Sequence, residues 1–288
     1  MYKVIISLLL SLGLVFCVSA QEVTPKKKKK SKKTITADPD AKLQSPKDVA
    51  FDEKSGLFYI SSPGNHGIIK RGRRGGAVFA VKELEDPNGV LIYGGILYVA
   101  DVNKVKAYNL KKEEKIFEIV VEGASSLRSL ATDGTHVYAS DQTANKVFLI
   151  NLRQKEAELL TDKVESPTGV FYSKKHKDLL ILSSKESGGG IYAYSFKDKK
   201  TTLALEINEF PYLEDITFNG SMSYYLTAYG ADKKENVIIK VNDALSREPR
   251  VIQSTADGPA GIKYIKRTNE LAIANDYSNN LNIIKLGY

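Results

Sequence analysis

The chain has 288 residues with a formal net charge of +8, and Cys17 is its only cysteine. Residues 1–44 hold nine lysines against three acidic residues, net +6, so that residues 45–288 carry only +2. This distribution argues against nucleic-acid binding by the folded part of the chain, and one cysteine excludes a disulfide framework.

The N-terminus has the pattern of a secretory signal. Lys3 is followed by an apolar stretch from Val4 to Val18, and Val18-Ser19-Ala20 is a small-x-small cleavage site. We therefore predict a signal peptide over residues 1–20 and an exported protein, periplasmic or secreted. The alternative is a lipid anchor on Cys17, which Phe16 disfavours because lipoprotein signals need a small residue there.

A lysine-rich arm follows over residues 21–33, with its seven lysines between Lys26 and Lys33. A charge run of this kind is typical of a solvated, disordered segment that can also touch anionic surfaces. Residues 34–43 have strand propensity around Ile35, with Pro39 as a break. We expect this segment to pair with Asn282–Lys285 and so close the last repeat.

Residues 45–288 contain six copies of one pattern at intervals of 40 to 46 residues. Each copy starts with a short apolar run, continues through a Gly or Asn turn into a second run rich in tyrosine and β-branched residues, and ends in a more polar strand. A period near 40 built this way predicts four-stranded blades. The predicted fold class is all-β, a six-bladed β-propeller over residues 34–288, ring closed by an N-terminal strand, and we expect a monomer.

Two features of the copies resemble known families of propeller repeats. The runs Leu97–Val105 and Val137–Val147 resemble NHL repeats, and the P-x-G-V openings resemble the gluconolactonase/senescence-marker-protein and strictosidine-synthase-like propellers. The gluconolactonase resemblance implies a calcium ion at the channel mouth that drives lactone hydrolysis. Its ligands would be a Glu in E-G-P, an Asn before Gly and an Asp before Gly.

The equivalent residues at the starts of the six innermost strands, which we call the strand-start column, contain few of these calcium ligands. Only an asparagine and a glutamate match in character, E-G-P is absent, and two cations stand among them; the column reads Lys47, Asn88, Arg128, Thr168, Glu214 and Ala260. Calcium requires several converging oxygen ligands. We therefore predict no metal and no cofactor, with Ca²⁺ as the alternative.

The next column contains small residues except for two acids, and reads Asp48, Gly89, Ser129, Gly169, Asp215 and Gly261. Channel-mouth carboxylates need partners, and Lys47 and Arg128 are candidates. Asp101 and Asp141, at second-strand ends, are expected to fasten the following loops by accepting backbone N–H bonds. No Ser-His-Asp order, G-x-S-x-G or H-E-x-x-H motif occurs.

Two functions remain after these exclusions. The first is a non-catalytic propeller that binds a small molecule, glycan or envelope protein at the channel-mouth face. Its predicted ligand-binding residues are Lys47, Asp48, Asn88, Arg128, Thr168, Glu214 and Asp215, with mixed charge suited to an anionic or zwitterionic ligand. The alternative is a calcium-dependent lactonase or esterase-like hydrolase.

Overall fold

The structure is a computed structural model that describes residues 37–232, 235–255 and 257–287. The predicted signal peptide, the lysine-rich arm and residues 34–36 lie outside the described residues. One compact unit comprises Ile35–Tyr288. Within the described ranges no helix has both the length and the apolar character needed to cross a bilayer.

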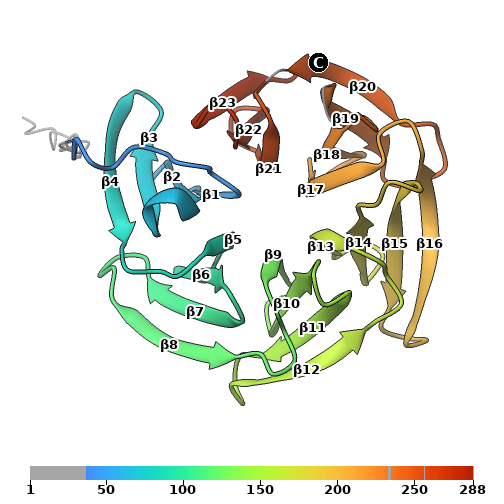
Figure 1. The fold of residues 1–288 in the computed structure, drawn as a ribbon, viewed down its shortest axis with the longest axis horizontal. Coiled ribbons are helices and arrows are strands. Elements are labelled where there is room, and N and C mark those ends of the chain that lie inside the picture. Colours follow the sequence, from blue (N-terminus) through green and yellow to red (C-terminus); the bar gives the residue numbers. More distant parts are fainter. Residues whose placement is uncertain (1–36, 233–234, 256, 288) are drawn as a thin grey trace, which may run out of the picture. The chain divides into compact units, whose positions relative to one another are not determined.

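Six antiparallel sheets surround a central axis, as the repeats predict (Figure 1). The first blade comprises β1 (Val49–Asp52), β2 (Leu57–Ser62), β3 (Gly67–Gly72) and β4 (Gly75–Val81), with the 3-10 helix η1 at Pro63–Asn65. The second comprises β5 (Pro87–Tyr93), β6 (Ile96–Asp101), β7 (Lys104–Asn109) and β8 (Lys115–Val120). The third comprises β9 (Leu127–Thr132), β10 (His136–Asp141), β11 (Lys146–Asn151) and β12 (Glu156–Thr161).

The remaining blades complete the ring. The fourth comprises β13 (Pro167–Ser173), β14 (Asp178–Ser183), β15 (Gly189–Ser195) and β16 (Lys200–Ile207). The fifth comprises β17 (Tyr212–Phe218), β18 (Ser223–Tyr229), β19 (Asn236–Asn242) and β20 (Arg250–Thr255). The sixth has three described strands, β21 (Pro259–Ile265), β22 (Glu270–Asn275) and β23 (Asn280–Lys285). The all-β, six-bladed propeller is confirmed.

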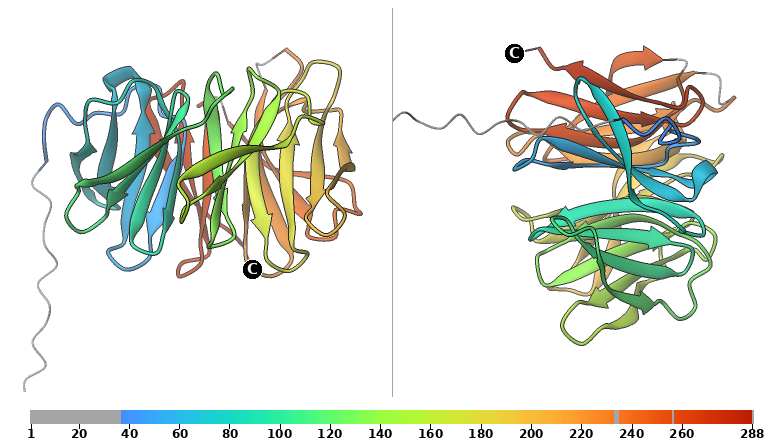
Figure 2. Two further views of the ribbon diagram at one scale, coloured as in Figure 1. Left: turned by 90° about the horizontal axis from the view of Figure 1, so that it is seen from below. Right: turned by 90° about the vertical axis from the view of Figure 1, so that its left-hand side faces the viewer.

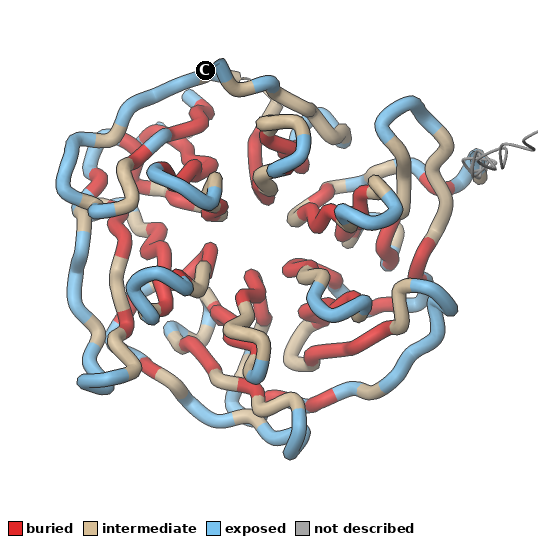
Figure 3. Tube along the Cα trace, turned by 180° about the vertical axis from the view of Figure 1, so that it is seen from behind, coloured by how far each residue is buried: buried red, intermediate tan, exposed pale blue. Residues whose placement is uncertain are grey.

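In every blade, burial falls from the second strand to the outermost described strand (Figure 3). Second strands are buried almost throughout, because they pack against both neighbouring blades. The fourth strands β8, β12, β16 and β20 are mostly exposed. This exposure accounts for the polar residues of β12, β16 and β20, whereas β4 keeps an apolar sequence and is only partly exposed. In the side views the inner strands run along the axis of the ring, so their ends form its two faces (Figure 2).

The predicted closing strand is wrong for the residues that the structure describes. Residues 37–48 form no strand, and β23 has no fourth strand beside it among the described residues. This segment instead crosses the first blade from its outer edge to the axis (Figure 1), with the Asp38 amide donating to Ala77 O in β4 at 2.8 Å. Side chains hold the junction to the sixth blade, because Leu43 packs into the core cluster that also contains Leu281 and Ile283.

Candidate functional site

The six innermost strands converge on an axial channel with three parts. At the strand-start face lies a vestibule of about 320 Å³. At the hairpin face lies an inner cavity of about 490 Å³. Between them is a constriction of only about 20 Å³, which we call the neck.

Two ion pairs occupy the vestibule. The ammonium nitrogen of Lys47 lies 2.5 Å from a carboxylate oxygen of Asp276. The guanidinium of Arg128 binds the carboxylate of Glu214, and this neighbour raises the pKa of Arg128. The expectation that Arg128 partners a channel-mouth acid is therefore confirmed, whereas Lys47 pairs with Asp276 instead of Asp48, Glu214 or Asp215. Both cations are already neutralised.

Tyrosines supply the apolar surface of the vestibule. The rings of Tyr229 and Tyr277 lie 5.9 Å apart between centroids, inclined by 50°. Tyr277 is 56% exposed and covers Gly258, which has a φ of +71° and no room for a β-carbon beneath the ring. Burial, followed by Glu214, raises the pKa of the Tyr229 phenol, so its hydroxyl stays protonated. Gln142 and Ser184 add neutral polar groups to the wall.

Two of the predicted ligand-binding residues, Thr168 and Asn88, form hydrogen bonds to backbone carbonyls of the propeller. Thr168 is fully buried, and its hydroxyl donates to Leu213 O at 2.7 Å, which joins the fourth blade to the fifth. Asn88 lines the neck, but its amide nitrogen donates to Asp86 O at 3.2 Å. Thr168 lines neither the vestibule nor the neck.

Asp48 and Asp215 lie at the neck and line both the neck and the inner cavity. Asp48 accepts hydrogen bonds from the amides of Val49 at 2.6 Å and Val90 at 2.7 Å. Asp215 accepts one from the Ile262 amide at 2.8 Å. Burial raises the pKa of Asp48 to about 6, and burial together with the charge of Asp48 raises the pKa of Asp215 well above 3.8.

These contacts follow a rule around the ring. In the first, third and fifth blades, Asp48, Ser129 and Asp215 each accept the amide N–H at the start of the next blade; for Ser129 the donor is Val170 at 3.3 Å. In the second, fourth and sixth blades the same position is glycine. A β-carbon there would lie within 2.4–2.7 Å of the next blade's backbone at all three sites, Gly89, Gly169 and Gly261.

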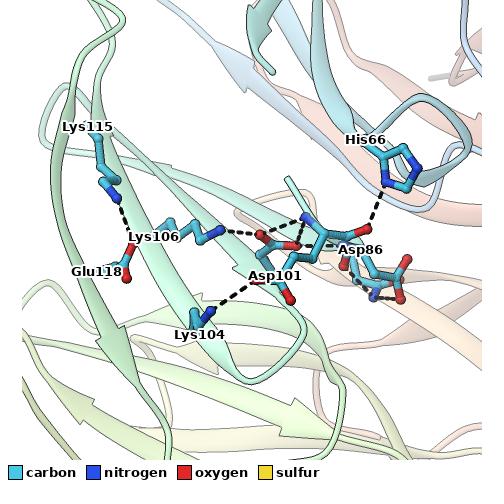
Figure 4. A network of polar contacts seen from close by, with 9 residues as sticks. His66, Asp86, Asp101, Lys104, Lys106, Lys115 and Glu118 are labelled. Atoms are coloured by element: carbon cyan, nitrogen blue, oxygen red, sulfur yellow. Dashed lines mark hydrogen bonds and ion pairs between the residues drawn. The ribbon is translucent and has the colours of Figure 1, made fainter. Parts of the chain in front are cut away.

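Asp101 and Asp141 behave as backbone acceptors, with one correction. Asp101 is fully buried and accepts from the amides of Glu85 and Asp86, at 3.0 and 2.7 Å, and from Lys106 Nζ at 2.5 Å (Figure 4). Asp141 accepts from Ser125, Ser126 and Ala144. Except for Ala144, the fastened amides lie in the loop before the blade's first strand and not in the loop after Asp101 or Asp141.

The vestibule and neck do not fit the calcium cage that the resemblance implies. Glu214 is bound by Arg128, the Lys47 ammonium lies beside Asp276, and the two neck carboxylates are held by backbone amides. In the part of the chain that the structure describes, no group of three His, Cys, Asp or Glu side chains is placed to hold a metal ion. Like-charge repulsion from Lys47 and Arg128 would oppose a divalent cation here.

Comparisons with known proteins agree on the fold. No family model and no curated protein matches the chain. A Bacteroides thetaiotaomicron protein of unknown function aligns with TM-score 0.71 and 11% identity over 85% of this chain and 70% of that one. A structure named as a gluconolactonase gives TM-score 0.65 and 12% identity, over 85% and 91%.

A third structure, the Kuenenia stuttgartiensis hydrazine synthase, aligns with TM-score 0.62 and 14% identity over 88% of this chain and 98% of that one. At these identities the likenesses show the propeller fold alone. Consistent with the resemblance in the repeats, a gluconolactonase is among the structural neighbours.

Several channel residues were missed in the sequence. Asp276 directly follows a second strand, one residue beyond the position that Asp101 and Asp141 occupy in their blades, so its place was visible in the sequence but its partner was not. Tyr229 and Tyr277 gave no signal among 16 tyrosines, because nothing in the sequence distinguishes a channel tyrosine from one packed inside a blade. Lys263 lines the inner cavity and had a signal, since it stands two residues after Gly261 where the other copies have no charge.

Proposed function

We propose that this chain is an exported, non-catalytic, monomeric propeller that binds a neutral saccharide in its vestibule. The observation that supports this most strongly is the charge state of the vestibule wall. Its two cations are each paired with a carboxylate, so an anionic ligand would have to displace Glu214 or Asp276. This narrows the sequence-based expectation of an anionic or zwitterionic ligand to a neutral one.

The chemistry of the wall suits sugar hydroxyls and sugar ring faces. The exposed ring of Tyr277 offers a flat apolar surface beside Tyr229. Gln142, Ser184 and the two ion pairs supply donors and acceptors around it. In addition, Arg128 Nε has no hydrogen-bond partner, which leaves one donor unsatisfied at the base of the vestibule.

The test is calorimetric titration of the mature protein with maltotriose, cellotriose and chitotriose. We expect saturable binding of at least one, weakened tenfold or more by Tyr277→Ala, because an aromatic platform is lost. Met222→Ala is the matched control; Met222 is 71% exposed and lines neither the vestibule nor the inner cavity. No binding, or equal binding by both variants, would contradict the proposal.

The calcium-dependent lactonase is the alternative, supported by the fold likeness to a gluconolactonase. It predicts calcium binding and lactone hydrolysis that a chelator abolishes. A Glu214→Gln variant separates the two functions, because it removes the one vestibule glutamate while preserving shape. Lactonase activity lost in that variant would establish the enzyme and displace the binding proposal.

A further inference from the structure

The inner cavity is a preformed chamber separate from the vestibule. All six blades contribute to its wall, and its volume of about 490 Å³ is in the range of small-molecule sites. Aromatic residues are among those that line it, including Tyr93, Phe171, Tyr172 and Phe218. The neck, at about 20 Å³, has room for no more than a water molecule, so a ligand must enter from the hairpin face.

Lys263 breaks a pattern in this wall. Two residues after the neck position, the first, third and fifth blades carry the small Ala50, Ala131 and Thr217, and the second and fourth carry the large, apolar Leu91 and Phe171. The sixth blade has Lys263 at the equivalent place. A lysine where packing asks for an apolar side chain is a departure that space filling does not explain.

The inner end of the cavity therefore presents both signs of charge. Lys263 acts on both Asp48 and Asp215, lowering the pKa of each against the larger effect of burial. Arg128 also faces this region but is paired with Glu214. At the solvent end, Lys174 and Lys175 are exposed, and Lys175 pairs with Asp243.

The presence of both a lysine and aspartates at the inner end disfavours a ligand whose head group carries a net charge. An anionic head group at the inner end would face the Asp48 carboxylate beside Asp215, and a cationic one would face the Lys263 ammonium, in an apolar surrounding where such repulsion is weakly screened. An uncharged group that both donates and accepts can use the lysine N–H and a carboxyl oxygen together. Hydrogen bonds to charged partners are stronger than neutral ones.

We propose that the inner cavity is a second ligand site, for a molecule with an aromatic or aliphatic body and an uncharged hydroxyl or amide end. The aromatic wall holds the body, and Lys263 with Asp48 and Asp215 holds the polar end. This site does not depend on the proposed saccharide site, because the neck separates the two chambers.

The test uses three probes of one shape: 2-phenylethanol, 2-phenylethylamine and 3-phenylpropionate, titrated calorimetrically into the mature protein at pH 7.5. We expect the alcohol to bind at least tenfold more tightly than either ion. Tighter binding of the amine or of the carboxylate, or no saturable binding of any probe, would overturn the proposal.

Two variants invert the selectivity and so distinguish recognition from structural damage. Lys263→Met places an apolar side chain at the position that Leu91 and Phe171 occupy in the second and fourth blades. This variant should bind the alcohol at least fivefold more weakly and the amine more tightly than the wild type. Asp215→Asn keeps an oxygen for the Ile262 amide and should strengthen the carboxylate relative to the alcohol. Unchanged probe preference in both folded variants would also overturn the proposal.

A vestibule variant keeps this result separate from the proposed function. Tyr277→Ala should leave the affinity for 2-phenylethanol unchanged, because Tyr277 lines the vestibule and not the inner cavity. A parallel loss of alcohol and saccharide binding would mean one continuous site and would contradict two separate chambers.

Discussion

Odd-numbered and even-numbered blades contact the next blade differently at the axis. In the first, third and fifth blades a side chain at the neck reaches the next blade's backbone, and a serine or threonine from the second strand, Ser61, Ser140 or Thr227, accepts the amide of that same residue. In the second, fourth and sixth blades the neck residue is glycine, and the backbones approach directly. Six similar repeats thus make two kinds of junction, one hydrogen-bonded and one closely packed.

The largest effect should come from filling a closely packed junction. A β-carbon at Gly261 would lie 2.4 Å from Asp48 Cα and 2.8 Å from Lys47 O, and backbone atoms cannot move aside as a side-chain end can. We expect Gly261→Ala to lower the free energy of unfolding by about 3 kcal/mol, measured by urea denaturation. Gly287→Ala is the control, since nothing lies within 4 Å of that site. Equal stability of both variants would show that the sixth and first blades are not in tight contact.

The next effect tests the hydrogen-bonded junctions through pH. Because burial raises the pKa of Asp48 to about 6 from 3.8, the folded protein binds protons more tightly than the unfolded chain. Stability should therefore fall as pH rises through that window, by about 3 kcal/mol, and stay lower above it. Asp215→Asn removes the neighbouring charge, so this variant should gain stability at pH 7.5 relative to the wild type and differ little at pH 4.

Asp101→Asn is the contrasting variant for that experiment. Asp101 is a buried carboxylate as well, but Lys106 and two loop amides compensate its charge. Its replacement should destabilise the protein at neutral pH, because the Lys106 ammonium would be left without its acid. If Asp101→Asn and Asp215→Asn change stability in the same direction at pH 7.5, the two carboxylates do not differ as described.

The smallest effect concerns the junction that uses a hydroxyl. Ser129 accepts the Val170 amide at 3.3 Å, a longer bond than those to Asp48 and Asp215. We expect Ser129→Ala to cost about 1 kcal/mol in chemical denaturation, the ordinary contribution of one buried hydrogen bond. A loss as large as that of Gly261→Ala would remove the distinction between the two kinds of junction.

The repeats predicted the fold, but the sequence could not show which side chains of different blades pair with one another. The strand-start columns correctly identified Lys47, Asp48, Arg128, Glu214 and Asp215 as channel residues, because equivalent positions of blades converge on one axis. Lys47 and Asp276 are 229 positions apart, and only closure of the ring brings them together. Thr168 belongs to the same column but lines neither the vestibule nor the neck, because its hydroxyl donates to the Leu213 carbonyl of the next blade.

For the described residues 37–43, the predicted closing strand was wrong for a related reason. Strand propensity around Ile35 and a three-stranded last copy were both real features, but propensity does not fix a partner. Over the described residues 37–43 the chain makes its contacts with the first blade, through Asp38 and Ala77, and through Leu43 with the core at the sixth. The alternation at the neck, in contrast, is visible in the sequence, because every second residue in the column of Asp48 to Gly261 is glycine; what the sequence does not show is the hydrogen bond that the other three residues accept from the next blade.

That alternation has a consequence for the number of blades. A pattern in which hydrogen-bonding side chains and glycines take turns can close on itself only around an even ring. With five or seven blades, two neighbours of the same kind would have to meet, either two side chains competing for one space or two glycines leaving a gap. Parity at the axis thus disfavours the loss or duplication of a single repeat, and the shortest insertion that preserves the packing is a pair of blades.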